Sequence, residues 1–216
     1  MEPARLRVNE IFHSIQGEGT RVGVPCVFVR LTGCHLRCVW CDTPYAFHEG
    51  ELRTLDDVCA RVREFACPTV EITGGEPLLQ PAVYPLMSQL ADEHETLLLE
   101  TSGAVPIDKV DPRVVRIMDI KCPGSGESER NHWPNIELLT TRDEVKLVLA
   151  DRADYEWAKD VLRRYDLAKR CPVLFAPVHG GVAPLDLATW ILDDRLDVRL
   201  GLQLHKLIWG AEARGV

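Results

Sequence analysis

The chain has 216 residues, of which 46% are hydrophobic and 27% charged, a composition that predicts one soluble domain, residues 1–216, with a sizeable core. Its formal net charge of −8 argues against nucleic acid as a partner, because proteins that bind nucleic acid normally present a basic face. No apolar run approaches the ~20 residues that span a bilayer, and the N-terminus lacks an apolar signal region, so we expect no membrane partner and a cytoplasmic location.

The first two apolar runs predict strands. Residues 6–15 alternate loosely and end at Gln16-Gly17-Glu18-Gly19, which is either a plain surface turn or a turn that lifts polar groups into a site. Residues 26–31 are β-rich and predict a buried strand that Arg30 interrupts. A buried arginine needs an anionic partner, and the sequence alone weighs a structural carboxylate and a ligand carboxylate equally.

A loop over residues 33–50 comes next, and a helix follows it. Residues 55–65 place apolar side chains at helical spacing, with Thr54 as the expected N-cap. Residues 69–72 predict a short strand that runs into Thr73-Gly74-Gly75-Glu76-Pro77. Two adjacent glycines at a strand end leave the backbone bare, so a ligand can approach the main chain closely.

The second half of the chain continues the alternation of strands and helices. We expect strands at residues 96–100, 114–119, 145–150, 171–176 and 198–203, and helices around 83–90, 158–165 and 184–194. The stretch between residues 100 and 114 is too short for a good helix. Residues 123–138, rich in Gly, Ser, Glu, Asn and Pro, predict a surface excursion.

Strands that alternate with helices predict βαβ units and a parallel sheet. Polar residues gather just after the predicted strand ends, which is where α/β barrels place their sites. Eight full units need about 250 residues, so 216 is short. We therefore expect an α/β fold that is an incomplete, laterally open TIM barrel of the (βα)6 type with a reduced helical complement.

Three of the eight cysteines, Cys34, Cys38 and Cys41, have the spacing C-x3-C-x2-C. Structural zinc takes four ligands and a [4Fe–4S] cluster usually takes four thiolates, so three thiolates leave one metal corner open for chemistry. A zinc site completed by a nearby histidine or a distant cysteine remains an alternative. The other cysteines show no clustered spacing and are interpreted as small buried hydrophobes: Cys26, Cys59, Cys67, Cys122 and Cys171.

This cysteine spacing, with Trp40 before the third cysteine, resembles the signature of the radical S-adenosylmethionine (radical SAM) enzymes. Further motifs occur in the order familiar from the queuosine-pathway branch of that superfamily, whose members contract a pterin ring. The resemblance spans residues from about 10 to 210, and the motifs are Gln16-Gly17-Glu18-Gly19, Arg30, Cys41-Asp42-Thr43, Thr73-Gly74-Gly75-Glu76-Pro77, Glu100-Thr101-Ser102-Gly103, Asp119-Ile120-Lys121-Cys122-Pro123 and Gln203-Leu204-His205-Lys206.

The resemblance implies a reaction and its cofactors. The three thiolates would hold a [4Fe–4S] cluster whose fourth iron chelates S-adenosylmethionine, and the family requires Mg²⁺. The implied reaction is the contraction of 6-carboxy-5,6,7,8-tetrahydropterin to 7-carboxy-7-deazaguanine with loss of ammonia, which is lyase chemistry. An electron donor such as flavodoxin or ferredoxin and a homodimer are expected from the resemblance alone.

The resemblance also assigns roles to individual residues. Thr43 matches the magnesium-contacting threonine, and Arg30 matches the residue that grips the substrate carboxylate. The other positions matched to substrate contacts are Ile15, Gln16, Gly17, Glu18, Thr73, His205, Lys206 and the C-terminal Val216. The positions matched to S-adenosylmethionine contacts are Trp40, Asp42, Gly75, Glu76, Glu100, Thr101, Asp119, Lys121 and Pro177. His205 and Lys206 can also be interpreted as a surface pair that ends a strand, and the segments around 119 and 176–179 vary among relatives.

Two other classes of function stay open. The first is a different radical enzyme, such as a glycyl-radical activase, which shares the cysteine loop. The second is a non-catalytic iron–sulfur or zinc binding module. Metal content separates the second class, because a [4Fe–4S] protein holds about four irons per chain and a zinc module holds one zinc.

Overall fold

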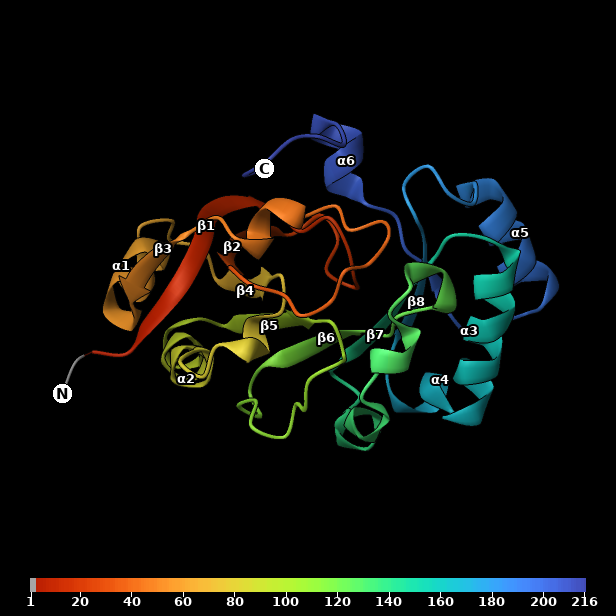
Figure 1. The fold of residues 1–216 in the computed structure, drawn as a ribbon, viewed down its shortest axis with the longest axis horizontal. Coiled ribbons are helices and arrows are strands. Elements are labelled where there is room, and N and C mark those ends of the chain that lie inside the picture. Colours follow the sequence, from red (N-terminus) through yellow and green to blue (C-terminus); the bar gives the residue numbers. More distant parts are fainter. Residues whose placement is uncertain (1–2) are drawn as a thin grey trace.

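A computed structural model describes residues 3–216 (Figure 1). Within those residues, nine strands form one sheet in the order β3-β1-β2-β4-β5-β6-β7-β8-β9. The strands are β1 Arg5–Ile15, β2 Pro25–Leu31, β3 Glu51–Thr54, β4 Thr69–Gly74, β5 Thr96–Thr101, β6 Val115–Asp119, β7 Glu144–Leu149, β8 Val173–Pro177 and β9 Arg199–Leu200. The helices are α1 Leu55–Arg63, α2 Val83–Glu93, α3 Arg152–Arg164, α4 Leu167–Arg170, α5 Pro184–Asp193 and α6 Leu204–Trp209.

The parallel part of the sheet confirms the expected open barrel. From β2 through β4 to β9, every neighbouring pair of strands is parallel. The order ends at β3 on one side and at β9 on the other, so the barrel is laterally open across the described chain. Between β5 and β6 the described chain has no α-helix, as expected from the short stretch there.

The N-terminal edge of the sheet differs from the prediction of a purely parallel sheet. β1 runs antiparallel to both β2 and β3. The chain passes from β1 to β2 through residues 16–24 without a helix, and a connection without a crossover joins antiparallel strands. β3 was not predicted, because its side chains are exposed or half-buried and show no apolar alternation.

The strands separate two layers of side chains. On the outer face, alternate residues such as Val70, Ile72 and Leu99 belong to the main core, which the helices cover. On the inner face, only Leu98, Val115 and Ile117 form a small separate apolar cluster. The interior of the barrel therefore has a small apolar floor. Polar side chains are found among the residues that line the cavity above it.

Local signals placed α1 correctly and did not predict α6. Thr54 caps α1 in a reciprocal capping box with Asp57, as its sequence position predicts. The strand expected at 198–203 is wrong beyond Arg199–Leu200, because the chain turns after β9 and α6 begins at Leu204. His205 and Lys206 therefore lie in a helix and do not end a strand.

The segment expected to be a surface excursion is partly buried. Residues 123–138 form the short 3₁₀ helices Pro123–Ser125, Ser128–Arg130 and Trp133–Leu138. Asn135 is buried and binds the loop after β5, accepting from the Ile107 amide and donating to the Val105 carbonyl. Most of the segment is exposed or half-buried, as expected, and its buried polar residue Asn135 is satisfied by these backbone partners.

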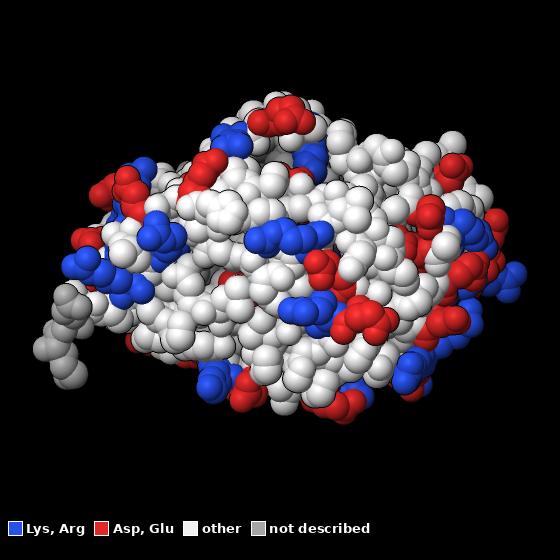
Figure 2. All heavy atoms as spheres, in the orientation of Figure 1, with Lys and Arg blue, Asp and Glu red and all other residues white. Residues whose placement is uncertain are grey.

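The visible surface carries charges of both signs. Figure 2 shows acidic and basic side chains interspersed over the visible face, with no continuous basic surface on that face. No helix within residues 3–216 combines the length and the apolar character that a membrane crossing needs.

Candidate active site

A cavity of about 640 Å³ lies at the carboxyl ends of the parallel strands. Its lining includes every residue that the sequence analysis assigned to the site except Glu76. A second cavity, of about 600 Å³, lies at the opposite ends of the strands and contains none of those residues. The site therefore occupies the end of the barrel where loops after the strands converge.

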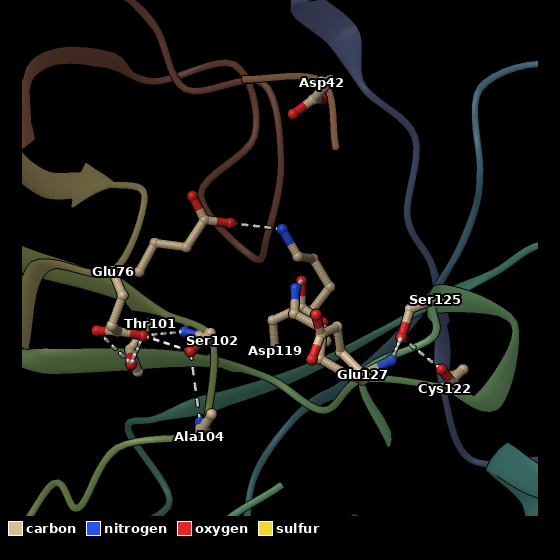
Figure 3. Close-up of polar contacts among 12 residues, drawn as sticks. Asp42, Glu76, Thr101, Ser102, Ala104, Asp119, Cys122, Ser125 and Glu127 are labelled. Atoms are coloured by element: carbon tan, nitrogen blue, oxygen red, sulfur yellow. Dashed lines mark hydrogen bonds and ion pairs between the residues drawn. The ribbon is translucent and has the colours of Figure 1, made fainter. Parts of the chain in front are cut away.

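The cysteine loop is fixed from outside by the 3₁₀ segment that follows β6. The Val39 amide donates to the Ser125 carbonyl at 3.0 Å, and the Arg37 amide donates to Glu127 Oε1 at 2.6 Å. Trp40 packs on Gly124, where an added Cβ would lie 3.1 Å from the ring. Figure 3 shows Ser125 and Glu127 side by side on this segment. The segment from 123 to 127 thus holds the loop in place.

Cys34, Cys38 and Cys41 are free thiols that line the same cavity, and each is partly buried. Burial raises the pKa of Cys34 and Cys38, so these thiols hold their protons until a metal displaces them. In the described part of the chain, no three His, Cys, Asp or Glu side chains converge tightly enough for one metal ion.

The Gly74-Gly75 turn lies directly against the cysteine loop. A Cβ added at Gly75 would come within 2.7 Å of Cys34 Cβ, so only glycine fits there. Gly74 has φ of +156° and takes up the turn after β4. The bare backbone lets this turn pack directly against the cysteine loop while both glycines line the cavity.

A charged pair flanks the loop on the β6 side. Lys121 Nζ donates to Asp119 Oδ2 at 2.8 Å, while Asp119 Oδ1 is buried without a hydrogen-bond partner within residues 3–216. Burial would lower the pKa of Lys121, but Asp119 and the nearby Cys38 sulfur outweigh it and raise that pKa. The cavity therefore offers a fixed ammonium and an unused carboxylate oxygen, which suit the amino and carboxylate groups of an amino-acid ligand.

Glu76 does not belong to this lining, although the sequence analysis assigned it to the cofactor. Its side chain is fully buried and accepts from the Leu78 amide, the Thr101 hydroxyl and the Ser102 amide and hydroxyl. Figure 3 shows its carboxylate directed at Thr101 and Ser102. Because every oxygen of Glu76 is already used, we assign it to the scaffold and propose no direct contact with a ligand.

An ion triad occupies the centre of the cavity. Lys146 Nζ on β7 lies 3.0 Å from Glu18 Oε2 and 2.5 Å from Glu100 Oε1. The Thr73 hydroxyl donates to the other oxygen of Glu100 at 2.9 Å. Burial would raise the pKa of Glu100, but Lys146 and Thr73 lower it to about 2. Glu100 is therefore held ionised as a hydrogen-bond acceptor, and Glu18 pairs with the same ammonium.

Two residues of this region were missed by the sequence analysis. Lys146 on β7 and Glu71 on β4 both line the cavity and are almost completely buried. Within the strands predicted at 69–72 and 145–150, each is the one charged residue, which is the same signal that identified Arg30. Applying that signal to every predicted strand would have found both.

Arg30 has a structural partner and still faces the cavity. Its Nε donates to Glu10 Oε1 at 2.7 Å, and the Tyr45 hydroxyl donates to the same oxygen at 3.0 Å. The guanidinium carbon lies 5.9 Å from the Phe12 ring centre and 6.0 Å from that of Tyr45. Within residues 3–216, Arg30 makes no ion pair or hydrogen bond through its two terminal nitrogens. The fork that binds a carboxylate is therefore available.

The C-terminal segment covers the mouth of the cavity. In Figure 1, α6 lies above the loop that follows β2. The Leu204 amide donates to the Gly17 carbonyl at 2.9 Å, and a side chain at Gly17 would collide with the ring of His205. Arg214 stacks over Tyr45 at 3.8 Å, and Val216 lines the cavity. The predicted ligand contacts of His205, Lys206 and Val216 stay predictions.

Comparisons with known proteins agree with this geometry. The family model described as the radical SAM superfamily matches residues 28–169. A protein of Chlorobaculum tepidum named 7-carboxy-7-deazaguanine synthase is 50% identical over 216 residues, which cover 99% of this chain and 98% of that protein. A protein of Koribacter versatilis with the same name is 45% identical, covering 98% of this chain and all of that protein.

A solved structure supports the fold. The crystal structure of QueE from Escherichia coli superimposes with a TM-score of 0.76 at 24% identity, covering 93% of this chain and 95% of that one. At this identity the likeness concerns the fold, and it confirms the partial barrel with its small helical complement.

Proposed function

The chain belongs to the radical SAM superfamily and, within it, to the 7-carboxy-7-deazaguanine synthases, and on that basis we propose that it contracts 6-carboxy-5,6,7,8-tetrahydropterin to 7-carboxy-7-deazaguanine with loss of ammonia, in queuosine biosynthesis. The observation that carries the proposal is that one cavity holds both the three-cysteine loop and the available fork of Arg30. The first serves the cofactor, and the second suits a substrate that carries a carboxylate.

The cofactors of the family are a [4Fe–4S] cluster and S-adenosylmethionine, which supply one-electron bond cleavage and hydrogen abstraction when bound. Cys34, Cys38 and Cys41 are the residues that would hold the cluster. Gly75 leaves space beside them, and Lys121 with Asp119 offers the charges that an amino acid group needs.

The chain's own residues would bind and orient the pterin. Arg30, fixed through Nε by Glu10, presents its terminal nitrogens to the substrate carboxylate. Glu18, held by Lys146, can accept from the amino and ring N–H groups of the pterin, and Glu100, held by the same ammonium, is the acceptor that the resemblance matches to S-adenosylmethionine. Phe28, which stacks on Phe12 with ring centres 5.0 Å apart, gives the cavity an apolar wall.

Thr43 is the proposed contact of Mg²⁺. Its hydroxyl lines the cavity and donates to Asp42 Oδ1 at 3.0 Å. Mg²⁺ prefers oxygen ligands in near-octahedral geometry and keeps several waters. One hydroxyl cannot hold the ion alone, so the substrate and waters would supply the remaining oxygens.

The remaining parts of the proposal follow from the family. A one-electron donor such as flavodoxin or ferredoxin would reduce the cluster, because radical SAM chemistry consumes an electron. A homodimer and a cytoplasmic location complete the proposal.

An anaerobic assay tests the function. The reconstituted protein is incubated with the carboxytetrahydropterin, S-adenosylmethionine, Mg²⁺ and a reductant, and we expect 7-carboxy-7-deazaguanine and ammonia to form together. Cleavage of S-adenosylmethionine without consumption of the pterin would instead indicate another radical enzyme, such as a glycyl-radical activase. Protein that binds one zinc and no iron would indicate a binding module.

A further inference from the structure

Glu71 is a carboxyl group that neither the comparisons nor the proposed reaction accounts for. It lies in the middle of β4, opposite Phe28 on β2 and Leu98 on β5. Its neighbours Val70 and Ile72 point into the outer core, so Glu71 points into the barrel, where it lines the floor of the cavity. Only 3% of the residue is exposed.

The surroundings of Glu71 contain charges but no cation that pairs with it. Among residues 3–216 its side-chain hydrogen-bond partner is the Gln16 amide, which donates from Nε2 to Oε2, and it takes part in no ion pair. The nearest ammonium, Lys146, binds Glu18 and Glu100 instead. Arg30 on β2 pairs with Glu10, and the thiol of Cys26, also on β2, faces Glu71 as well.

An ionised carboxylate in this position would be costly. Transfer of a charge out of water without a paired countercharge is strongly unfavourable, so such groups take up a proton. Burial raises the pKa of Glu71 well above its usual range, and Glu100 and Glu18 add to the rise against the opposing effects of Lys146 and Arg30. Three carboxylates would otherwise face one ammonium, and a proton on Glu71 reduces the excess negative charge by one.

Glu71 acts on the cavity through Gln16. The Gln16 amide binds Glu71 with its nitrogen and accepts from the Glu18 amide with its oxygen at 3.0 Å. We propose that Glu71 is a neutral carboxylic acid and a positioning residue, which fixes the Gln16-Gly17-Glu18 turn in the shape that binds the pterin. The inference rests on the proposed function, because that turn is where the substrate is placed.

The proposal has a consequence for pH dependence. Ionisation of Glu71 would place a third negative charge beside Glu18 and Glu100, where it competes for Lys146 and disturbs the turn. Pterin binding should therefore weaken as the pH rises through the pKa of Glu71. Retention of the cluster should not follow the same change, because within residues 3–216 none of the three cysteines contacts Glu71, Gln16 or Glu18.

The first test compares the KM for the carboxytetrahydropterin across pH in wild-type holoenzyme and Glu71→Gln. The amide keeps the neutral charge and the acceptor oxygen, so we expect the variant to bind normally near neutral pH and to lose the rise of KM at alkaline pH. Glu71→Ala should raise KM about tenfold at every pH, the scale of one lost hydrogen bond in a buried site. Glu144→Gln, a buried glutamate that binds Thr20 outside the catalytic cavity, is the matched control and should keep the wild-type profile.

The second test needs no substrate. The infrared carbonyl stretch of a protonated carboxyl group should be present in wild-type protein near neutral pH and missing in Glu71→Gln, while Glu144→Gln retains it. Wild-type protein that shows this band but does not convert the pterin would contradict the proposed function alone. A wild-type band unchanged by Glu71→Gln, or a wild-type rise of KM that persists in Glu71→Gln, would overturn the inference about Glu71.

Discussion

Lys206 on α6 and Asp42 in the cysteine loop are joined by an ion pair, with 2.8 Å between Nζ and Oδ2, although 164 residues separate them in the sequence. Asp42 stands between Cys41, a proposed cluster ligand, and Thr43, the proposed magnesium contact. Gln203 at the start of α6 donates to both Asp42 and Glu18. The C-terminal helix is thus tied to the cofactor side and to the substrate side of the cavity.

Loss of the Lys206–Asp42 ion pair should make α6 more mobile over the cavity, and the cluster should be retained. In Lys206→Ala we expect faster hydrogen exchange of the backbone amides in α6 and weaker pterin binding, with unchanged iron content. Because Asp42 is half-exposed, the free energy of unfolding should fall by no more than about 1 kcal/mol. Lys169→Ala, which breaks an exposed pair with Asp166, is the control. Exchange in α6 at the wild-type rate would show that the pair does not hold the helix.

The cysteines divide into ligands and core residues. Cys38→Ala should abolish cluster retention and cleavage of S-adenosylmethionine, measured by iron content and by formation of 5′-deoxyadenosine. Cys59→Ala removes a buried sulfur on the core-facing side of α1, and should keep the iron while costing roughly 1 kcal/mol of unfolding free energy. Full iron loading in an active Cys38→Ala protein would rule out the cluster assignment.

Arg30 should affect the substrate and leave the cluster intact. Loss of one partner of a charge-assisted pair in a buried site costs about 2–5 kcal/mol, so Arg30→Ala should weaken pterin binding by at least about thirtyfold. Uncoupled cleavage of S-adenosylmethionine should survive. Glu10→Gln separates the two roles of Arg30, because it weakens the structural pair and leaves the guanidinium in place. If Glu10→Gln lowers pterin affinity as much as Arg30→Ala does, the structural pair is the main role of Arg30.

The sequence alone predicted what local spacing determines. The cap of α1 at Thr54, the strands of the parallel sheet and the three-cysteine loop all depend on residues close in sequence. What the sequence did not show depends on contacts that are distant in sequence. The motif matches Glu76 to the cofactor, whereas its hydrogen bonds to Thr101 and Ser102 are the reason that we assign it to the scaffold. Lys146 acquires its role only when the fold brings it to Glu18, 128 residues away.

Substitutions at Glu76 test its assignment to the scaffold. Glu76→Ala leaves the Ser102 amide and the Thr101 hydroxyl without an acceptor in a fully buried position, so it should lower the free energy of unfolding by about 3 kcal/mol or more. Glu76→Gln keeps one acceptor oxygen and should cost less. In protein that remains folded and loaded with iron, Glu76→Gln should bind S-adenosylmethionine with little change. A large loss of that affinity at unchanged stability would restore Glu76 to the cofactor site.

The magnesium role of Thr43 separates the pterin enzyme from its radical relatives. The Thr43 hydroxyl is exposed to the cavity and its partner within the described chain is Asp42, so a bound ion can displace that hydrogen bond at small cost. A single neutral hydroxyl binds Mg²⁺ weakly, and we expect tight binding only when the pterin contributes further oxygens. Turnover of wild-type protein should therefore rise with Mg²⁺, while binding of S-adenosylmethionine to the free enzyme should not.

Two substitutions of Thr43 test its proposed contact with Mg²⁺. In Thr43→Ala the Mg²⁺ concentration needed for half-maximal turnover should shift upward and turnover should fall, with iron content intact. Thr43→Ser keeps the hydroxyl and should be much milder. The measurement is a titration of turnover with Mg²⁺ in the three proteins at saturating pterin. Turnover that is indifferent to Mg²⁺, together with wild-type behaviour of Thr43→Ala, would remove the metal from the mechanism and leave Asp42 as the sole partner of this hydroxyl.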